Sequence, residues 1–128
     1  MGDNSSFDIS ASGIFAQRTR LDAIANNIAN AETTKTAEGG PYARQRVVFR
    51  AVFDDATGNR VNPMGVKVES VVQDTTDYRT VFDPGHPDAD ANGYLRMPNI
   101  NVVEEMTDMI SATRVYEANI TALNAAKS

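Results

Sequence analysis

Apolar side chains in the C-terminal segment recur at alternating intervals of four and three residues. This spacing places them on one face of a helix and is typical of helices packed as a coiled coil. The members of this row are Val102, Met106, Met109, Thr113, Tyr116, Ile120 and Leu123, and Val103 and Ile110 widen it. Asn101, three residues before Glu104, has the position of a helix N-cap. The pattern therefore predicts a long helix over residues 100–128 that needs a partner along its length.

The N-terminal segment predicts a second long helix. Residues 8–30 contain no proline, and their apolar side chains also recur at helical spacing. The residues on that face are Ile14, Leu21, Ile24, Ala25 and Ile28. Two amphipathic helices of matching length at the two ends of the chain indicate an antiparallel, coiled-coil-like pair.

Three asparagines near the end of the first helix need a reason, because Asn is a poor helix former. Asn30 can end the helix, since Asn tolerates the left-handed conformation found after helix ends. Asn26 and Asn27 can form polar contacts between packed helices, which fix register at some cost in stability. We expect Asn30 to be terminal and the other two to lie at an interface.

Large apolar residues are scarce. Leu, Ile, Val and Phe together number 27 of 128 residues, close to the level of roughly 20% below which chains tend towards disorder. Both helical faces are wider than a single pairing covers, so we expect other subunits to complete their burial. The alternative is a helical hairpin that packs on a β-sheet of the same chain.

The middle of the chain predicts a small β-rich module. Alternating patterns indicate strands at 45–53, 66–72, 78–82 and 94–97, with a turn at 54–59 that leads into a hairpin towards Val61. The predicted fold class is therefore α+β. It has an N-terminal helix in residues 1–30, a β-rich module in 31–99 and a C-terminal helix in 100–128, within one structural unit.

Composition excludes several classes of function. The chain has no cysteine, so it contains no disulfide, thiolate zinc site or cysteine nucleophile. A net charge of −5 disfavours nucleic acid as a partner. The sequence has no phosphate-binding glycine loop and no nucleophile elbow. We therefore expect that the protein is not an enzyme and that it binds no cofactor and no small-molecule substrate. If the protein leaves the cytoplasm, we expect it to do so without a cleaved signal peptide.

One loop resembles half of a calcium site. Asp88, Asp90 and Asn92 alternate like the first ligands of a calcium-binding loop, but Asn99 replaces the glutamate that supplies two oxygens at the twelfth position. Asp, Asn and Gly also form tight turns through side-chain to backbone hydrogen bonds. We expect a structural loop, without bound metal, and calcium binding stays open as the alternative. The residues of this loop are Asp83, Pro84, His86, Asp88 and Asp90.

A more specific likeness covers nearly the whole chain. Its motifs are Ser12-Gly13-Ile14, residues 25–31 with Thr33, Thr33-Thr34-Lys35-Thr36, Gly39-Gly40-Pro41-Tyr42, residues 83–90, Gly93-Tyr94, residues 97–101 and the helix from Glu104 to Asn119. Together they resemble the bacterial flagellar rod and hook proteins, and among these the proximal rod subunits.

The resemblance implies a structural subunit of the basal-body rod, which spans the periplasm and transmits torque from the rotor to the distal rod and hook. It implies terminal helices that polymerise in an inner α-helical core, with the β-rich module outside. The implied partners are other copies of the chain, other proximal and distal rod proteins, the rotor-ring junction protein and the flagellar type III export apparatus. The runner-up is a calcium-responsive helical binding module that uses the Asp88 to Asn92 loop.

Overall fold

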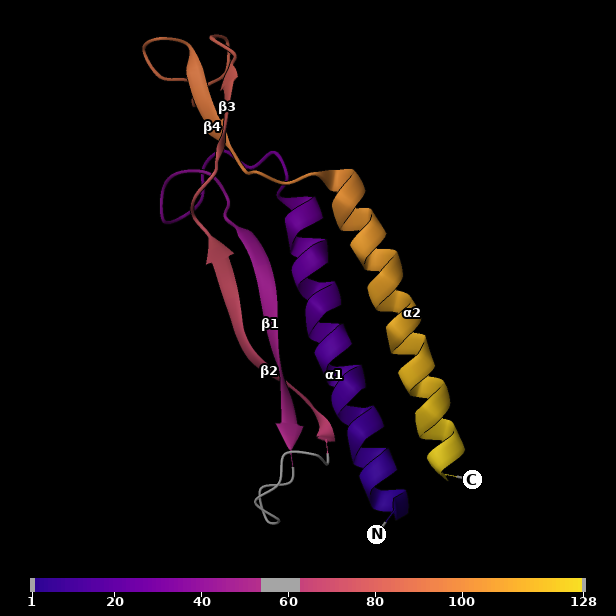
Figure 1. Cartoon of the computed structure of the whole chain (residues 1–128). Coiled ribbons are helices and arrows are strands. Elements are labelled where there is room, and N and C mark those ends of the chain that lie inside the picture. Colours follow the sequence, from indigo (N-terminus) through magenta and orange to yellow (C-terminus); the bar gives the residue numbers. More distant parts are fainter. Residues whose placement is uncertain (1, 54–62, 128) are drawn as a thin grey trace.

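Two long helices and two β-hairpins make up the part of the protein that the structure describes. The computed structural model describes residues 2–53 and 63–127, with the side chains of residues 2–5 and 63 left out of the description. In chain order the elements are α1 (Gly2–Ala29), β1 (Arg44–Phe53), β2 (Pro63–Asp74), β3 (Arg79–Phe82), β4 (Tyr94–Met97) and α2 (Val102–Lys127) (Figure 1). The fold is therefore an α+β mixture, as predicted. The expected turn at 54–59 and Val61 lie outside the described residues.

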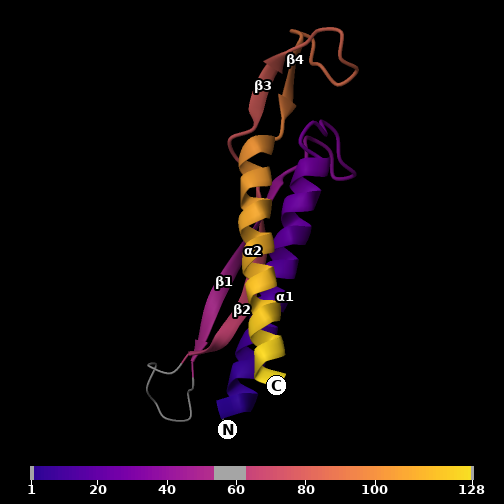
Figure 2. The same ribbon diagram turned by 90° about the vertical axis from the view of Figure 1, so that its right-hand side faces the viewer.

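The helices α1 and α2 lie side by side and run in opposite directions (Figures 1 and 2). Asn27, near the end of α1, contacts Glu105, near the start of α2, and Gly13 faces Asn119 at the other end of the pair. The helices contain 28 and 26 residues, so each is roughly 40 Å long. Neither described helix is apolar enough over a sufficient length to cross a membrane.

Small side chains form the buried contact between the helices. Ala16, Ala23 and Ala112 have exposed fractions of 1%, 5% and 0%, and Ser10 is also buried. Gly13 lies so close to α2 that a Cβ added there would be 2.7 Å from Nδ2 of Asn119. These small residues let the two backbones approach closely. The hydrophobic pattern of the sequence does not predict this row of small residues.

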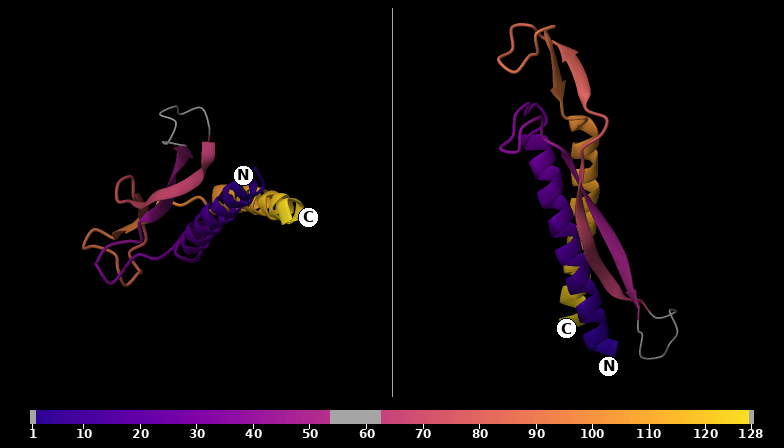
Figure 3. Two further views of the ribbon diagram at one scale, coloured as in Figure 1. Left: turned by 90° about the horizontal axis from the view of Figure 1, so that it is seen from below. Right: turned by 90° about the vertical axis from the view of Figure 1, so that its left-hand side faces the viewer.

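The first hairpin covers the side of α1 that α2 leaves open. β1 and β2 pair antiparallel from Arg44 opposite Asp74 to Phe53 opposite Pro63, with irregularities after Val48 and after Val52. The backbone N–H of Val66 donates to Oγ of Ser12, 3.1 Å away, which ties β2 to α1. Figure 3 shows the resulting order of hairpin, α1 and α2. The alternative of packing on the chain's own sheet therefore holds for α1, whereas α2 has no sheet against it.

The second hairpin extends beyond the helices (Figure 1). β3 and β4 pair antiparallel from Arg79 opposite Met97 to Phe82 opposite Tyr94. The loop between them is tied to the segment after α1, where Oγ1 of Thr34 donates to a carboxylate oxygen of Asp88 at 2.6 Å. All four strands agree with the sequence prediction to within about three residues.

We expect Gly13→Val to destabilise the fold, because the new side chain overlaps the amide of Asn119 and forces the helices apart. Overpacking of this kind costs about 1–3 kcal/mol. Urea unfolding followed by circular dichroism measures the loss. Ala25→Val, at an exposed position of the same helix, is the control and should stay within about 0.5 kcal/mol of the native protein. Equal stability of the two variants would contradict a close contact at Gly13.

Candidate assembly interface and the polar cluster beside it

The start of α2 is fixed by a side-chain cap. Oδ1 of Asn101 accepts hydrogen bonds from the backbone N–H groups of Val103 at 3.0 Å and Glu104 at 3.2 Å. This satisfies two of the N–H groups that a helix leaves unpaired at its start. Asn101 therefore has the N-cap role that the sequence predicted. The capped turn places the next residue, Glu105, against α1.

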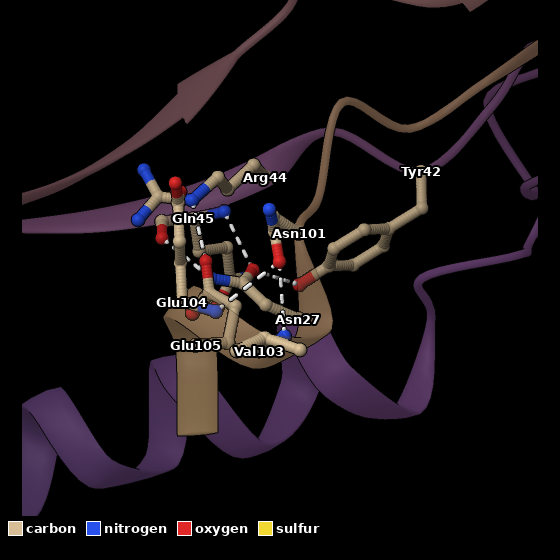
Figure 4. Close-up of polar contacts among 8 residues, drawn as sticks. All are labelled: Asn27, Tyr42, Arg44, Gln45, Asn101, Val103, Glu104 and Glu105. Carbon is tan, nitrogen blue, oxygen red and sulfur yellow. Dashed lines mark hydrogen bonds and ion pairs between the residues drawn. The ribbon is translucent and has the colours of Figure 1, made fainter. Parts of the chain in front are cut away.

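Glu105 is the most deeply buried charged residue that the structure describes, with an exposed fraction of 2%. Its Oε1 accepts a hydrogen bond from Nε of Arg44 at 2.6 Å, and its Oε2 accepts one from Nδ2 of Asn27 at 3.3 Å (Figure 4). A buried carboxylate is tolerated only when it is paired and hydrogen-bonded. Glu105 meets both conditions, with one partner from β1 and one from α1.

Asn27 joins three elements through one side-chain amide and has an exposed fraction of 1%. Its Oδ1 accepts from the backbone N–H of Gln45 at 2.8 Å, and its Nδ2 donates to the carbonyl oxygen of Gln45 at 2.9 Å. The amide thus takes the place of a neighbouring strand at the start of β1. The hydroxyl of Tyr42 also donates to Oδ1, at 3.1 Å. Among the described residues, no buried side-chain nitrogen or oxygen lacks a hydrogen-bond partner.

The neighbouring Asn26 and Asn30 make contacts that differ from those of Asn27. Asn26 is exposed and contacts the side chain of Gln45 only at 3.5 Å. Asn30 follows the last residue of α1, and its Nδ2 donates to the carbonyl oxygen of Asn26 at 2.9 Å. The expected terminal position of Asn30 is confirmed, since α1 ends at Ala29, but the left-handed conformation is absent there: Asp77 is the one non-glycine residue with positive φ in the described ranges. The Asn30 side chain thus donates to the same carbonyl of the last helical turn that accepts its own backbone N–H at 3.1 Å.

Large apolar side chains at the start of α2 are exposed. Val102, Val103, Met106 and Ile110 have exposed fractions of 36%, 72%, 51% and 56%. We call these four residues the α2 ridge. They lie roughly a third of a turn around the helix from the buried Glu105 and Ala112, at 3.6 residues per turn. In the described chain only α1 packs along α2, and β1 reaches α2 only through the side chain of Arg44.

The remaining residues of the two predicted faces range from buried to exposed. Ile24 is buried and Ala25 is exposed. The half-buried residues are Ile14, Leu21, Ile28, Met109, Thr113, Tyr116, Ile120 and Leu123. The contact with α1 on α2 is centred on the row of Glu105 and Ala112, so the predicted apolar row flanks this contact and does not fill it.

Hydrogen bonds shape the loop between β3 and β4. Oδ1 of Asp90 accepts from the backbone N–H groups of Asn92 and Tyr94, each at 2.9 Å. Nδ1 of His86 accepts from the N–H of Asp88 at 3.0 Å, and the N–H of His86 donates to the carbonyl oxygen of Asp83 at 3.1 Å. Within the described residues, no cluster of three acidic or histidine side chains is arranged to hold a metal ion. The calcium alternative therefore has no support in the structure.

Two known protein families match the two ends of the chain. Residues 7–35 match the family described as flagella basal body rod protein. Residues 91–128 match the family described as flagellar basal body rod FlgEFG protein C-terminal. The two matches cover the parts of the chain that contain α1 and α2, so the class of protein is that of the flagellar rod proteins.

Full-length relatives narrow this class. The chain is 44% identical to the flagellar basal-body rod protein FlgC of Borreliella burgdorferi, with 100% of this chain and 93% of the relative covered. It is 46% identical to the protein of the same name from Salmonella typhimurium, over 95% of this chain and 88% of the relative. The flagellar basal-body rod protein FlgC of Bacillus subtilis is 40% identical to it, over 95% of this chain and 89% of the relative. The chain belongs to the FlgC family of flagellar basal-body rod proteins.

We expect Asn27→Ala to destabilise the protein by at least about 2 kcal/mol, because it leaves the backbone of Gln45 and one oxygen of Glu105 without partners in a buried site. Urea unfolding provides the measurement. Asn26→Ala is the matched control, since the neighbouring side chain is exposed, and it should change stability by less than about 0.5 kcal/mol. Similar losses for the two variants would contradict the assigned role of Asn27.

Alkaline pH provides a second test of the cluster. Burial, and secondarily the negative charge of Glu105, raise the pKa of Tyr42 above its ordinary value of 10.0. A pKa raised by folding stabilises the native state below the unfolded pKa, and this contribution is lost as pH rises through the folded pKa. Between about pH 9 and 11 the native protein should therefore lose stability more steeply than Tyr42→Phe. If the stability of the two proteins changed with pH in the same way, a raised pKa of Tyr42 in the folded state would be contradicted.

Proposed function

We propose that the chain is a structural subunit of the flagellar basal-body rod and that the α2 ridge is a contact with neighbouring rod subunits. The observation that carries this proposal is four adjoining large apolar side chains with exposed fractions of 36% to 72%. They occur in a chain whose relatives are named as rod proteins. Exposed apolar patches of this kind mark interaction sites.

The energetics favour this use of the ridge. Full burial of one large aliphatic side chain contributes about 1.5–3 kcal/mol, and the ridge has most of that contribution still available. The inside of the protein, by contrast, is built largely from Ala, Gly and hydrogen-bonded polar groups. A neighbouring helix that covers the ridge adds the apolar burial that the single chain lacks.

The paired helices would then form a coiled-coil-like inner layer of the rod. In this arrangement the segments 1–30 and 100–128 lie in the helical core, and residues 31–99 lie outside it. The exposed and half-buried members of the two predicted faces, from Ile14 to Ile28 and from Val102 to Leu123, contact neighbouring subunits, whereas the buried Ile24 does not. Close-packed contacts resist shear, so many helices in parallel can transmit torque from the rotor to the distal rod and hook.

The same proposal covers partners and location. The partners are other copies of the chain and other rod proteins of the basal body, and the flagellar type III apparatus exports the chain without a cleaved signal. The rod formed in this way spans the periplasm. The role is mechanical, without a catalytic step, a cofactor or a small-molecule substrate.

We expect Ile110→Asp to block rod assembly and swimming while leaving expression and the subunit fold unchanged. A carboxylate at a desolvated helix contact costs several kcal/mol, whereas the same group is solvated in the free subunit. Motility in soft agar and the recovery of hook–basal bodies measure the effect. The control is Ser111→Asp, which adds the same charge at an exposed neighbouring position and should swim normally. Normal swimming of both variants would contradict the α2 ridge as an interface.

A further inference from the structure

The hairpin of β3 and β4 presents an exposed aromatic pair. Phe82 and Tyr94 have exposed fractions of 61% and 46%, and their ring centroids lie 5.1 Å apart at an interplanar angle of 64°. Each strand has four residues, and within the described chain the two strands pair only with each other. An isolated two-stranded hairpin is marginally stable in water. The aromatic face therefore lacks a covering layer in the single chain.

The aromatic pair is held in place before any partner arrives. Gly93, at φ 87°, lies beneath Phe82, and a Cβ on Gly93 would be 2.9 Å from Cε1 of the ring. The N–H of Tyr94 is bound by Oδ1 of Asp90 at 2.9 Å. Side chains that are ordered beforehand lose little entropy on binding, and aromatic residues are frequent anchors of interfaces. We call Phe82 and Tyr94, with the loop 83–93, the knob.

The charge of the knob is uniformly negative. Residues 83–93 contain three aspartates, Asp83, Asp88 and Asp90, and no lysine or arginine. Asp83 directly follows Phe82 in the chain, and its N–H donates to the carbonyl oxygen of Gly93 at 2.9 Å. Asp88 faces Thr34, Lys35 and Arg96, so Asp83 is the carboxylate next to the rings in the chain, and a partner that receives the rings is favoured by a basic rim.

A cavity with matching chemistry lies elsewhere on the same chain. It has a volume of about 230 Å³ and is bounded by α1, β1 and the start of α2. A cavity of about 150 Å³ is enough to bind benzene in an apolar protein site. Ala23, Ile24, Val47 and Phe49 supply apolar lining, and Arg20 and Arg46 supply positive charge. We call these six residues the socket.

The side chains that line the cavity carry a net positive charge, and Asp74, which is outside the lining, also lies near Arg46. Arg44 also lines the cavity, but Glu105 neutralises it at 2.6 Å. Asp108 is the remaining carboxylate of the lining, against Arg20 and Arg46. An incoming group with negative charge beside aromatic rings therefore complements both the apolar lining and the basic rim.

We propose that the knob of one copy occupies the socket of a second copy. This proposal rests on the proposed rod function and names one contact through which it is carried out. A contact within one chain is excluded, because β3 and β4 approach neither α1 nor β1. A contact between two different surfaces of identical chains is heterologous, and such contacts generate rings or open helical arrays. The pairing thus gives the subunit a direction of growth.

Site-directed cross-linking tests the contact, because the native chain contains no cysteine. The double variant Asp83→Cys with Arg46→Cys places one thiol on the knob and one at the socket. After oxidation of isolated basal bodies we expect a dimer of this chain. The control pair is Asp83→Cys with Arg50→Cys, at an exposed position of β1 outside the socket, and it should give no dimer.

Charge exchange provides the functional test. Asp83→Lys and Arg46→Glu should each reduce swimming, and their combination should restore it, which a simple folding defect would not do. The proposal is overturned if cells swim with the cysteine variants in their basal bodies but oxidation yields no dimer of this chain. It is also overturned if the only cross-link formed joins the chain to another rod protein. Those results leave the proposed rod function intact. Absence of the native chain from basal bodies would instead reject the rod function itself.

Discussion

The arrangement of the molecule depends on the amide of Asn27. It binds both backbone polar groups of Gln45 and one oxygen of Glu105, so one side chain sets the register of α1 against β1 and of α1 against α2. An apolar residue could fill the same space, but it could not distinguish one register from a neighbouring one. Polar groups of this kind contribute specificity at some cost in stability, as they do in coiled coils.

The polar cluster explains how a chain with so few large apolar residues keeps a defined shape. Small residues along α1 let α2 approach closely, and Glu105, Arg44 and Tyr42 close the upper end of the contact around Asn27. Large side chains such as Met106 and Ile110 are then not needed inside. They remain on the surface, where the proposed function uses them between subunits.

Much of the fold could be predicted from the sequence, because the relevant signals are local. Alternation located the first strand, and the N-cap of α2 followed from Asn101 with Glu104 three residues later. The contact between the helices was less accessible, since Gly13, Ala16 and Ala112 produce no hydrophobic periodicity. A row of small residues can be read as a packing surface only when the partner's position is known.

Glu105 shows why the centre of the site was missed. A glutamate in the first turn of a helix normally interacts with the free N–H groups and with solvent, and its partner Arg44 is 61 positions away in sequence. The clustering of Asn26, Asn27 and Asn30 was the one signal that pointed to this region. It led to an expected contact between helices, and Asn27 makes such a contact with α2 as well as one with β1.

The shape of the molecule limits how such subunits can associate. Both helices and the first hairpin share one long axis, and the second hairpin extends past the helices at one end (Figure 1). The proposed contacts use two different surfaces of the chain, the α2 ridge and the socket. A subunit with two separate, non-equivalent contact surfaces has at least two neighbours. This is the requirement for an extended assembly, whereas a closed dimer would need one self-complementary surface.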